Sequence, residues 1–114
     1  MSAKPVIARA SDRRDVEDAV DHYSGVAGDA VVRGFIDSLE VAYLHIAEHP
    51  QAGSTRYAHD LDLAGLRSWR LKRYPHIVFY VEREEHIDVW RVLHGRRDIP
   101  SWMLDPESEA DAEP

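Results

Sequence analysis

The residues just before Pro50 have the order and spacing of a metal-binding motif. His45, Glu48 and His49 match the pattern His-x-x-Glu-His, in which two imidazoles on one helix face hold zinc and the glutamate acts as a base. A zinc site also needs a third ligand and a cleft, and the helix dipole alone favours histidine near a helix end. We therefore interpret the motif as structural, and we expect neither a metal nor another cofactor.

Cationic side chains gather in the second half of the chain, with a tyrosine among them. A ribonuclease needs a group to activate the 2′-hydroxyl, a group to protonate the leaving oxygen, and cations on the phosphate; His94 and a neighbouring arginine could supply part of this. Strand parity separates Arg70 from Arg67 and Arg73, so the arginines cannot all converge. The alternative, which the composition favours, is that they pair with acidic helices or cover a sheet face. The set comprises Arg67, Arg70, Arg73, Tyr80, Arg91, His94, Arg96 and Arg97.

Three strands in a row must position these side chains. Residues 66–73 alternate apolar and polar side chains, residues 74–82 are almost continuously apolar, and residues 86–94 resume after a short polar break. Period-two alternation and β-branched or aromatic runs predict strands. Because the connections are short, we expect an antiparallel meander.

The first half of the chain predicts a short strand and two helices. Residues 4–10 form the strand candidate, and Ser11 or Asp12 is suited to cap a helix that ends near Gly25 or Gly28. A second helix, capped by Asp29, runs to about residue 49 with a strong apolar stripe. Residues 51–65 read as a loop in which 57–63 could add an irregular strand. The order β-α-α-β-β-β predicts an α+β fold of two layers, with the helical hairpin packed on one face of the sheet.

Apolar residues return close to the end of the chain. Residues 99–104, with Trp102, Met103 and Leu104, predict an apolar turn or a short C-terminal helix that docks on the core or meets a partner. The last ten residues, 105–114, hold five acids and no base. We expect one domain over residues 1–104, followed by a disordered acidic tail.

Composition limits the class of protein. The 114 residues include no cysteine, so disulfides and thiolate metal sites are excluded. No apolar run is long enough to span a membrane, which predicts a cytoplasmic protein without a membrane partner. The net charge of −7 disfavours general nucleic-acid binding, although it is compatible with a small local basic site, and we expect no direct sequence-specific nucleic-acid binding. The charge is unevenly distributed, however, because residues 66–98 hold eight Lys or Arg against five acids.

Two blocks of the second half, residues 74–80 (YPHIVFY) and 91–98 (RVLHGRRD), resemble the ParE branch of the RelE/ParE toxin superfamily. The helix pair, then His49-Pro50 and Gly53, then Leu66-Arg67 opening a strand, match the usual layout of that superfamily. The resemblance covers about residues 5–104. It implies a toxin of a type II toxin–antitoxin pair, with an antiparallel sheet, a helical hairpin packed on it, and the first strand beside the last.

The resemblance also implies a mode of action. ParE-like toxins are associated with inhibition of DNA gyrase by binding, without hydrolytic chemistry, and are neutralised by a ParD-like antitoxin. The sister RelE branch cuts messenger RNA on the ribosome, and the nearest match to its catalytic cluster here is Arg67, Arg73, His94 and Arg97. The chain lacks the lysine-rich surface typical of those nucleases, so gyrase inhibition is the leading interpretation and RNA cleavage the alternative.

The same resemblance implies site residues. In ParE-like proteins the end of the last strand and the C-terminal segment are implicated in target binding, which here means His94, Arg96, Arg97, Trp102, Met103 and Leu104. The helical hairpin is expected to bind the antitoxin through the apolar stripe of its second helix, with Val32, Phe35, Ile36, Leu39 and Tyr43. The toxin and antitoxin are expected to form a hetero-oligomer.

Overall fold

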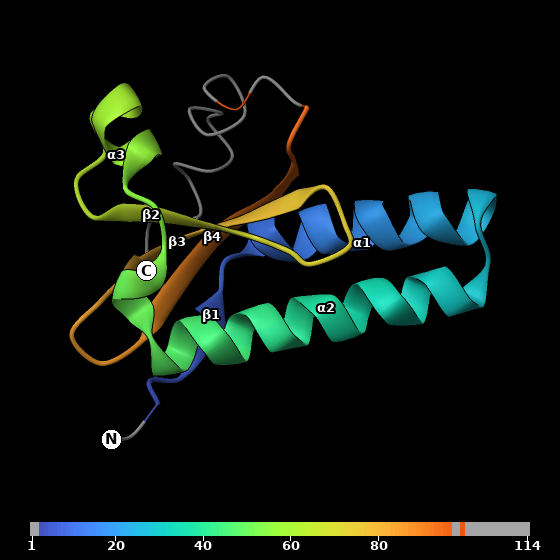
Figure 1. Cartoon of the computed structure of the whole chain (residues 1–114), viewed down its shortest axis with the longest axis horizontal. Helices are drawn as coiled ribbons and strands as arrows, with labels where there is room; N and C mark the ends of the chain where they lie inside the picture. Colours follow the sequence, from blue (N-terminus) through green and yellow to red (C-terminus); the bar gives the residue numbers. More distant parts are fainter. Residues whose placement is uncertain (1–2, 97–98, 100–114) are drawn as a thin grey trace.

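The three C-terminal strands form the antiparallel meander that their alternation predicts. The computed structural model describes residues 3–96 and 99, as an α+β fold with a four-stranded sheet in the order β1-β4-β3-β2 (Figure 1). The elements are β1 (Val6–Ala8), α1 (Ala10–Val26), α2 (Asp29–Glu48), a 3-10 turn (Pro50–Ala52), α3 (Arg56–Leu61), β2 (Leu66–Arg70), β3 (His76–Glu82) and β4 (Ile87–His94).

The first strand lies beside the last, as expected, but it runs parallel to it. Val6 pairs with Ile87 and Ala8 with Val89, so the sheet is mixed. A tight turn forces antiparallel pairing only between strands that lie close together in the chain. Because the helical hairpin, α3 and the meander separate β1 from β4, the chain is free to return in the parallel sense.

The helical hairpin covers one face of the sheet, as predicted. Helices α1 and α2 are joined through Ala27 and Gly28, whose φ of 89° suits glycine, and they lie side by side (Figure 1). The apolar stripe of α2 is buried against strand residues that point to the same side, which makes this face the larger core. Its centre is formed by Phe35, Leu39, Ile46, Val78, Tyr80 and Val89.

The second face of the sheet is covered by α3. The sequence predicts an irregular strand over residues 57–63, and this prediction is wrong because 56–61 form a helix. Tyr57, Ala58 and Leu61 fall on one helix face and pack on a second buried cluster that includes Phe79 and Ile99. This cover explains why β3 is buried on both faces, with side chains from His76 to Val81 all buried.

Helix α1 begins earlier than its polar residues predict. Ser11 and Asp12 are suited to cap the helix, but Arg9 occupies the N-cap position and neither Ser11 nor Asp12 caps it. Both side chains instead point inward: the Ser11 hydroxyl donates to the Trp90 carbonyl at 2.8 Å, and Asp12 accepts from Tyr43. Their hydrogen bonds therefore join α1 to β4 and α2.

A bulge in β4 directs a charged side chain toward α1. The register between β3 and β4 shifts at Phe79 and Tyr80, so that Trp90 has no partner on β3. Trp90 packs on the second face, whereas Arg91 and Val92 both contact the α1 side through Asp15. An extra residue in one strand re-aims its neighbours in this way. The expected C-terminal helix and acidic tail lie outside the described residues, apart from Ile99, which is buried.

Candidate functional site

A hollow of about 530 Å³ lies between α1 and the end of β4. Helix α1 contributes Asp18, His22 and Tyr23 to its wall. The opposite side is formed by His76 of β3, by the last three residues of β4, from Val92 to His94, and by Arg96 after the strand. Imidazoles, a phenol, carboxylates and a guanidinium thus line one concave surface, and its volume falls in the usual range for ligand-binding clefts.

The histidine at the end of β4 is held in a fixed orientation. The backbone N–H of Arg96 donates to Nδ1 of His94 at 3.1 Å, so the neutral ring carries its proton on Nε2. The His94 ring meets that of His76 edge-to-face at 5.4 Å, and the Gly95 N–H donates to the Pro75 carbonyl at 2.7 Å. These contacts define the direction in which the chain leaves the sheet.

A buried ion pair joins Asp15, which lines the hollow, to Arg91 of β4. Arg91 donates to both carboxylate oxygens of Asp15, at 2.7 and 2.8 Å, and the Val92 N–H donates to the same carboxylate at 3.0 Å. Burial raises the pKa of Asp15, and the hydrogen bonds and charge of Arg91 oppose that rise. The pair fixes α1 against β4, so the wall of the hollow is rigid.

One turn earlier on α1, Asp12 is buried against Tyr43 of α2. The Tyr43 hydroxyl donates to the carboxylate at 3.0 Å. Burial is the main reason that the pKa of Asp12 rises to about 7; the Tyr43 hydrogen bond opposes the rise and the nearby Asp15 adds to it. Burial also raises the pKa of Tyr43, so this phenol stays protonated and acts as the donor.

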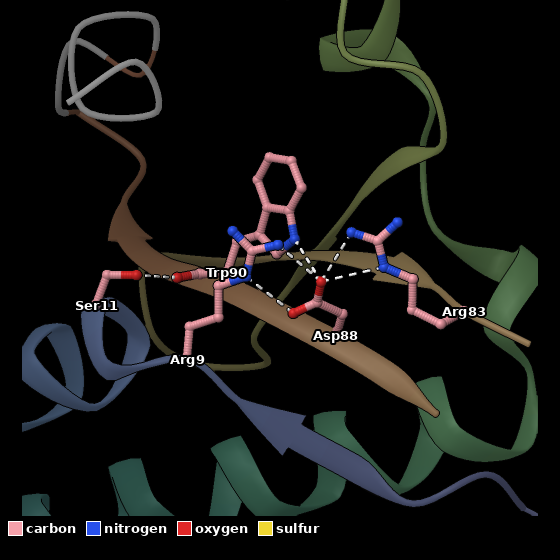
Figure 2. A network of polar contacts seen from close by, with 5 residues as sticks. All are labelled: Arg9, Ser11, Arg83, Asp88 and Trp90. Atoms are coloured by element: carbon pink, nitrogen blue, oxygen red, sulfur yellow. Dashed lines mark hydrogen bonds and ion pairs between the residues drawn. The ribbon is translucent and has the colours of Figure 1, made fainter. Parts of the chain in front are cut away.

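A third polar network, around Asp88, lies at the junction of β1 and β4. Figure 2 shows Arg9 and Arg83 approaching the Asp88 carboxylate from opposite sides, with Trp90 donating to it at 3.1 Å. Burial alone would raise the pKa of Asp88, but the hydrogen bonds from Arg9, Arg83 and Trp90 outweigh it and hold that pKa below its ordinary value. Arg9 also lies over the Trp90 ring, 4.3 Å from its centre. Because every polar group in this network contacts another, its role is structural.

Comparison with known proteins decides the family. A family model described as "ParE toxin of type II toxin-antitoxin system, parDE" matches residues 7–99. The chain belongs to the ParE toxin family. The fold is also similar to a solved structure described as "Chromosomal ParDE TA system from P. aeruginosa", with a TM-score of 0.68, 15% identity, and coverage of 81% of this chain and 96% of that one. A search of curated proteins found no match.

The residues of the nuclease alternative are not brought together in this ParE toxin. Arg67 lies on β2 opposite Tyr80, and its guanidinium donates to the Gln51 and Gly53 carbonyls at 3.1 and 2.9 Å. His94 pairs with His76, which is four residues from Tyr80 along β3, or about 13 Å. Arg73 is exposed in the β2–β3 turn with a φ of 70°, and Arg97 lies outside the described residues. Arg67 therefore serves to hold the loop after α2.

The histidines of the His-x-x-Glu-His motif likewise contact other rings and do not form a metal site. The two rings lie 5.1 Å apart, but His45 stacks on Trp69 at 4.4 Å. Across residues 3–96 and 99, no group of three or more His, Cys, Asp or Glu side chains is placed to hold a metal ion.

Of the residues predicted to bind a target, the structure describes His94 and Arg96, and both line the hollow. Arg97, Trp102, Met103 and Leu104 fall outside the described part of the chain. Sequence reasoning missed His22 and His76, which are far apart in the chain. The sequence did carry a signal for His22, because this residue lies one turn after Asp18 in the predicted first helix, on a face that also holds acidic residues.

The predicted antitoxin residues lie deeper in the ParE toxin than a binding surface requires. Phe35 and Leu39 are core residues, 0% and 5% exposed, so a partner cannot reach their side chains. Val32, Ile36 and Tyr43 are half-buried. The apolar residues that α2 leaves open to a partner are others: Val41 and Leu44, 60% and 59% exposed.

Proposed function

We propose that this ParE-family toxin acts by binding DNA gyrase and is neutralised by a ParD-like antitoxin. The observation that carries the proposal is the family match over residues 7–99. The solved neighbour is described as a ParDE system, which supports pairing with an antitoxin. In this proposal the toxin breaks no bond itself, and its effect comes from the surface that it presents.

The target-binding surface that we propose is the end of β4 together with the segment after it. His94 and Arg96 stand at the edge of the hollow, on a turn fixed by two hydrogen bonds. A rigid end of the sheet holds His94 and Arg96 at a constant position, which lowers the entropy lost on binding. Arg97, Trp102, Met103 and Leu104 complete this proposed surface.

The antitoxin surface that we propose is the outer face of α2. Val41 and Leu44 are one turn apart and exposed, and the acidic residues Asp37, Glu40 and Glu48 lie on the same outward face. This pattern fits an amphipathic segment with apolar anchors and basic residues at its rim. The buried Phe35 and Leu39 support the helix from below rather than contact the partner.

Expression without the partner tests the proposal in cells. The toxin should arrest growth and induce the DNA-damage response while translation continues, because poisoned gyrase leaves broken DNA. Co-expression of the neighbouring antitoxin gene should restore growth. Arrest of translation with intact DNA would contradict the proposal and favour the RNA-cleaving alternative.

A further inference from the structure

Four basic residues lie toward one end of the sheet: Arg70 at the end of β2, Lys72 and Arg73 in the turn after it, and Arg96 just after β4. From Gly65 to Val81 the chain has four Lys or Arg and no acid. The β2–β3 turn reaches the end of β4, because the Gly95 N–H donates to the Pro75 carbonyl at 2.7 Å (Figure 1). The Arg70 guanidinium also lies against Gly95, since a Cβ on that glycine would be 3.5 Å from Nη1. We call Arg70, Lys72, Arg73 and Arg96 the cationic end.

The four side chains of the cationic end are exposed, and none of the carboxylates that the structure describes forms an ion pair with them. All four residues are exposed, and no ion pair within residues 3–96 and 99 includes any of them. The wall of the hollow near Arg96 holds two carboxylates, Asp15 and Asp18, and Asp15 is paired with Arg91. A local positive potential can therefore persist although the whole chain carries −7.

A pocket of about 280 Å³ adjoins the cationic end, between the start of α3 and β2. Its lining includes the guanidinium-bearing residues Arg56 and Arg70 and the hydroxyl-bearing residues Ser54 and Ser68. The two serines are held together by backbone hydrogen bonds of 2.9 Å in both directions, so the pocket floor is fixed. Arg56 has one described carboxylate nearby, Asp60 at 3.8 Å, and both side chains are largely exposed. Guanidinium and hydroxyl donors on a fixed floor suit a phosphate.

The aromatic residues of the pocket are already engaged in packing. Trp69 stacks on His45 at 4.4 Å, and Tyr57 meets Phe79 edge-to-face at 5.2 Å. Proteins that bind single strands offer free aromatic rings on which bases stack. Because these rings are not free, the surface is suited to phosphates alone, which favours a duplex.

We propose that the cationic end and its adjoining pocket bind the phosphate backbone of double-stranded DNA, without reading its sequence. One phosphate would lie in the pocket between Arg56 and Arg70, and the next phosphates along Lys72, Arg73 and Arg96. This contact goes beyond the proposed function and stands apart from it, since it needs neither gyrase nor antitoxin.

Salt-dependent binding tests the inference. The full chain is titrated into a labelled mixed-sequence duplex of about 20 base pairs, with fluorescence anisotropy measured from about 25 to 200 mM salt. We expect log Kd to rise linearly with log salt, with a slope of about 3 that corresponds to three or four phosphates. Absence of binding at the lowest salt, or binding indifferent to salt, would overturn the inference.

Matched variants locate the contact. Arg70→Gln with Arg73→Gln should weaken binding about tenfold and lower the salt slope by about 2. Arg33→Gln, which removes an equal charge per site from the exposed face of α2, should change Kd by less than about twofold. An equal loss in the Arg33 variant, or no loss in the double variant, would refute the assignment.

Two further measurements distinguish loss of the DNA contact from loss of folding, and duplex binding from single-strand binding. Arg73→Gly removes the charge where φ is 70°, a conformation that glycine adopts without strain, so this variant should fold and still weaken binding. A single-stranded DNA or RNA of the same sequence should bind less tightly than the duplex. Tighter binding of either single strand would refute the choice of duplex.

Discussion

At the scale of single residues, two carboxylates on the inner face of α1 are held in different ways. Asp15 has a full cationic partner in Arg91, whereas Asp12 has only the hydroxyl of Tyr43. A buried ion pair adds little net stability over an apolar pair, but losing one partner leaves a buried charge unpaired. The two sites therefore predict opposite responses to mutation.

Asp15→Ala should destabilise the fold by about 3–5 kcal/mol, because it leaves the Arg91 guanidinium buried without its carboxylate. Urea unfolding followed by circular dichroism measures this loss. Replacing both partners, as Asp15→Leu with Arg91→Met, should recover much of it. Asp60→Ala, which breaks the exposed pair with Arg56, is the control and should have little effect. Equal stability of the Asp15→Ala variant and the parent would show that the pair is not buried as described.

Asp12 predicts a dependence of stability on pH. Its pKa is about 7 in the folded state and near 3.8 when unfolded, so folding favours the protonated form. The free energy of unfolding should fall as pH rises from about 4 through 7, because the unfolded state then releases its proton more easily.

Asp12→Asn removes this ionisation and keeps an acceptor for Tyr43. The variant should match the parent near pH 3, below the unfolded pKa of Asp12, and exceed it in free energy of unfolding at pH 8. Urea unfolding at the two pH values makes the comparison. A stability difference that is the same at both values would contradict the assignment of the pKa to Asp12.

At the scale of elements, the sequence predicts the meander and the hairpin because their patterns are local. The alternation in β2, the continuous apolar run of β3 and the stripe of α2 are each visible in a short window. Helix α3 is too short to be recognised in this way, because it has only six residues. Its apolar face, which is formed by Tyr57, Ala58 and Leu61, packs on the second side of the sheet. The parallel pairing of β1 depends on contacts across most of the chain.

The candidate site is less predictable than the elements that form it. His94 ends the last strand and Arg96 lies two residues on, so their place was accessible from the sequence. His76 joins them because it pairs with His94 across β3 and β4, and His22 joins them because α1 packs beside the end of β4. The stripe of α2 showed which side chains are apolar, but not that Phe35 and Leu39 would be buried in the core while Val41 and Leu44 remain exposed.

The outer face of α2 carries its own prediction. Leu44→Glu should weaken binding of the neighbouring ParD-like antitoxin by about 30-fold or more, since it places a charge in an apolar contact within an acidic rim. Isothermal titration calorimetry with the two purified proteins measures this. Val26→Glu alters another exposed apolar residue, at the far end of α1, and should leave the affinity unchanged. Equal effects of the two changes would remove α2 from the interface.

At the scale of the whole molecule, the charge is polarised. Residues 11–49, which include nearly all of both long helices, hold nine acids and three arginines, whereas residues 65–81, which include β2 and most of β3, hold four Lys or Arg and no acid. Such a distribution allows partners of opposite charge to bind on different sides, with the antitoxin on the acidic helices and an acidic ligand on the sheet. In the part of the chain that the structure describes, no helix is long and apolar enough to cross a membrane.

The most direct test of the central claim, that this toxin acts on gyrase by binding and without cutting nucleic acid itself, is a cleavage assay with purified gyrase and supercoiled plasmid. Addition of the toxin should increase the gyrase-linked, double-strand-cleaved fraction of the plasmid, and plasmid incubated with toxin alone should stay intact. Prior addition of the antitoxin should abolish the effect. Unchanged gyrase cleavage, together with cutting of messenger RNA on purified ribosomes, would contradict the claim.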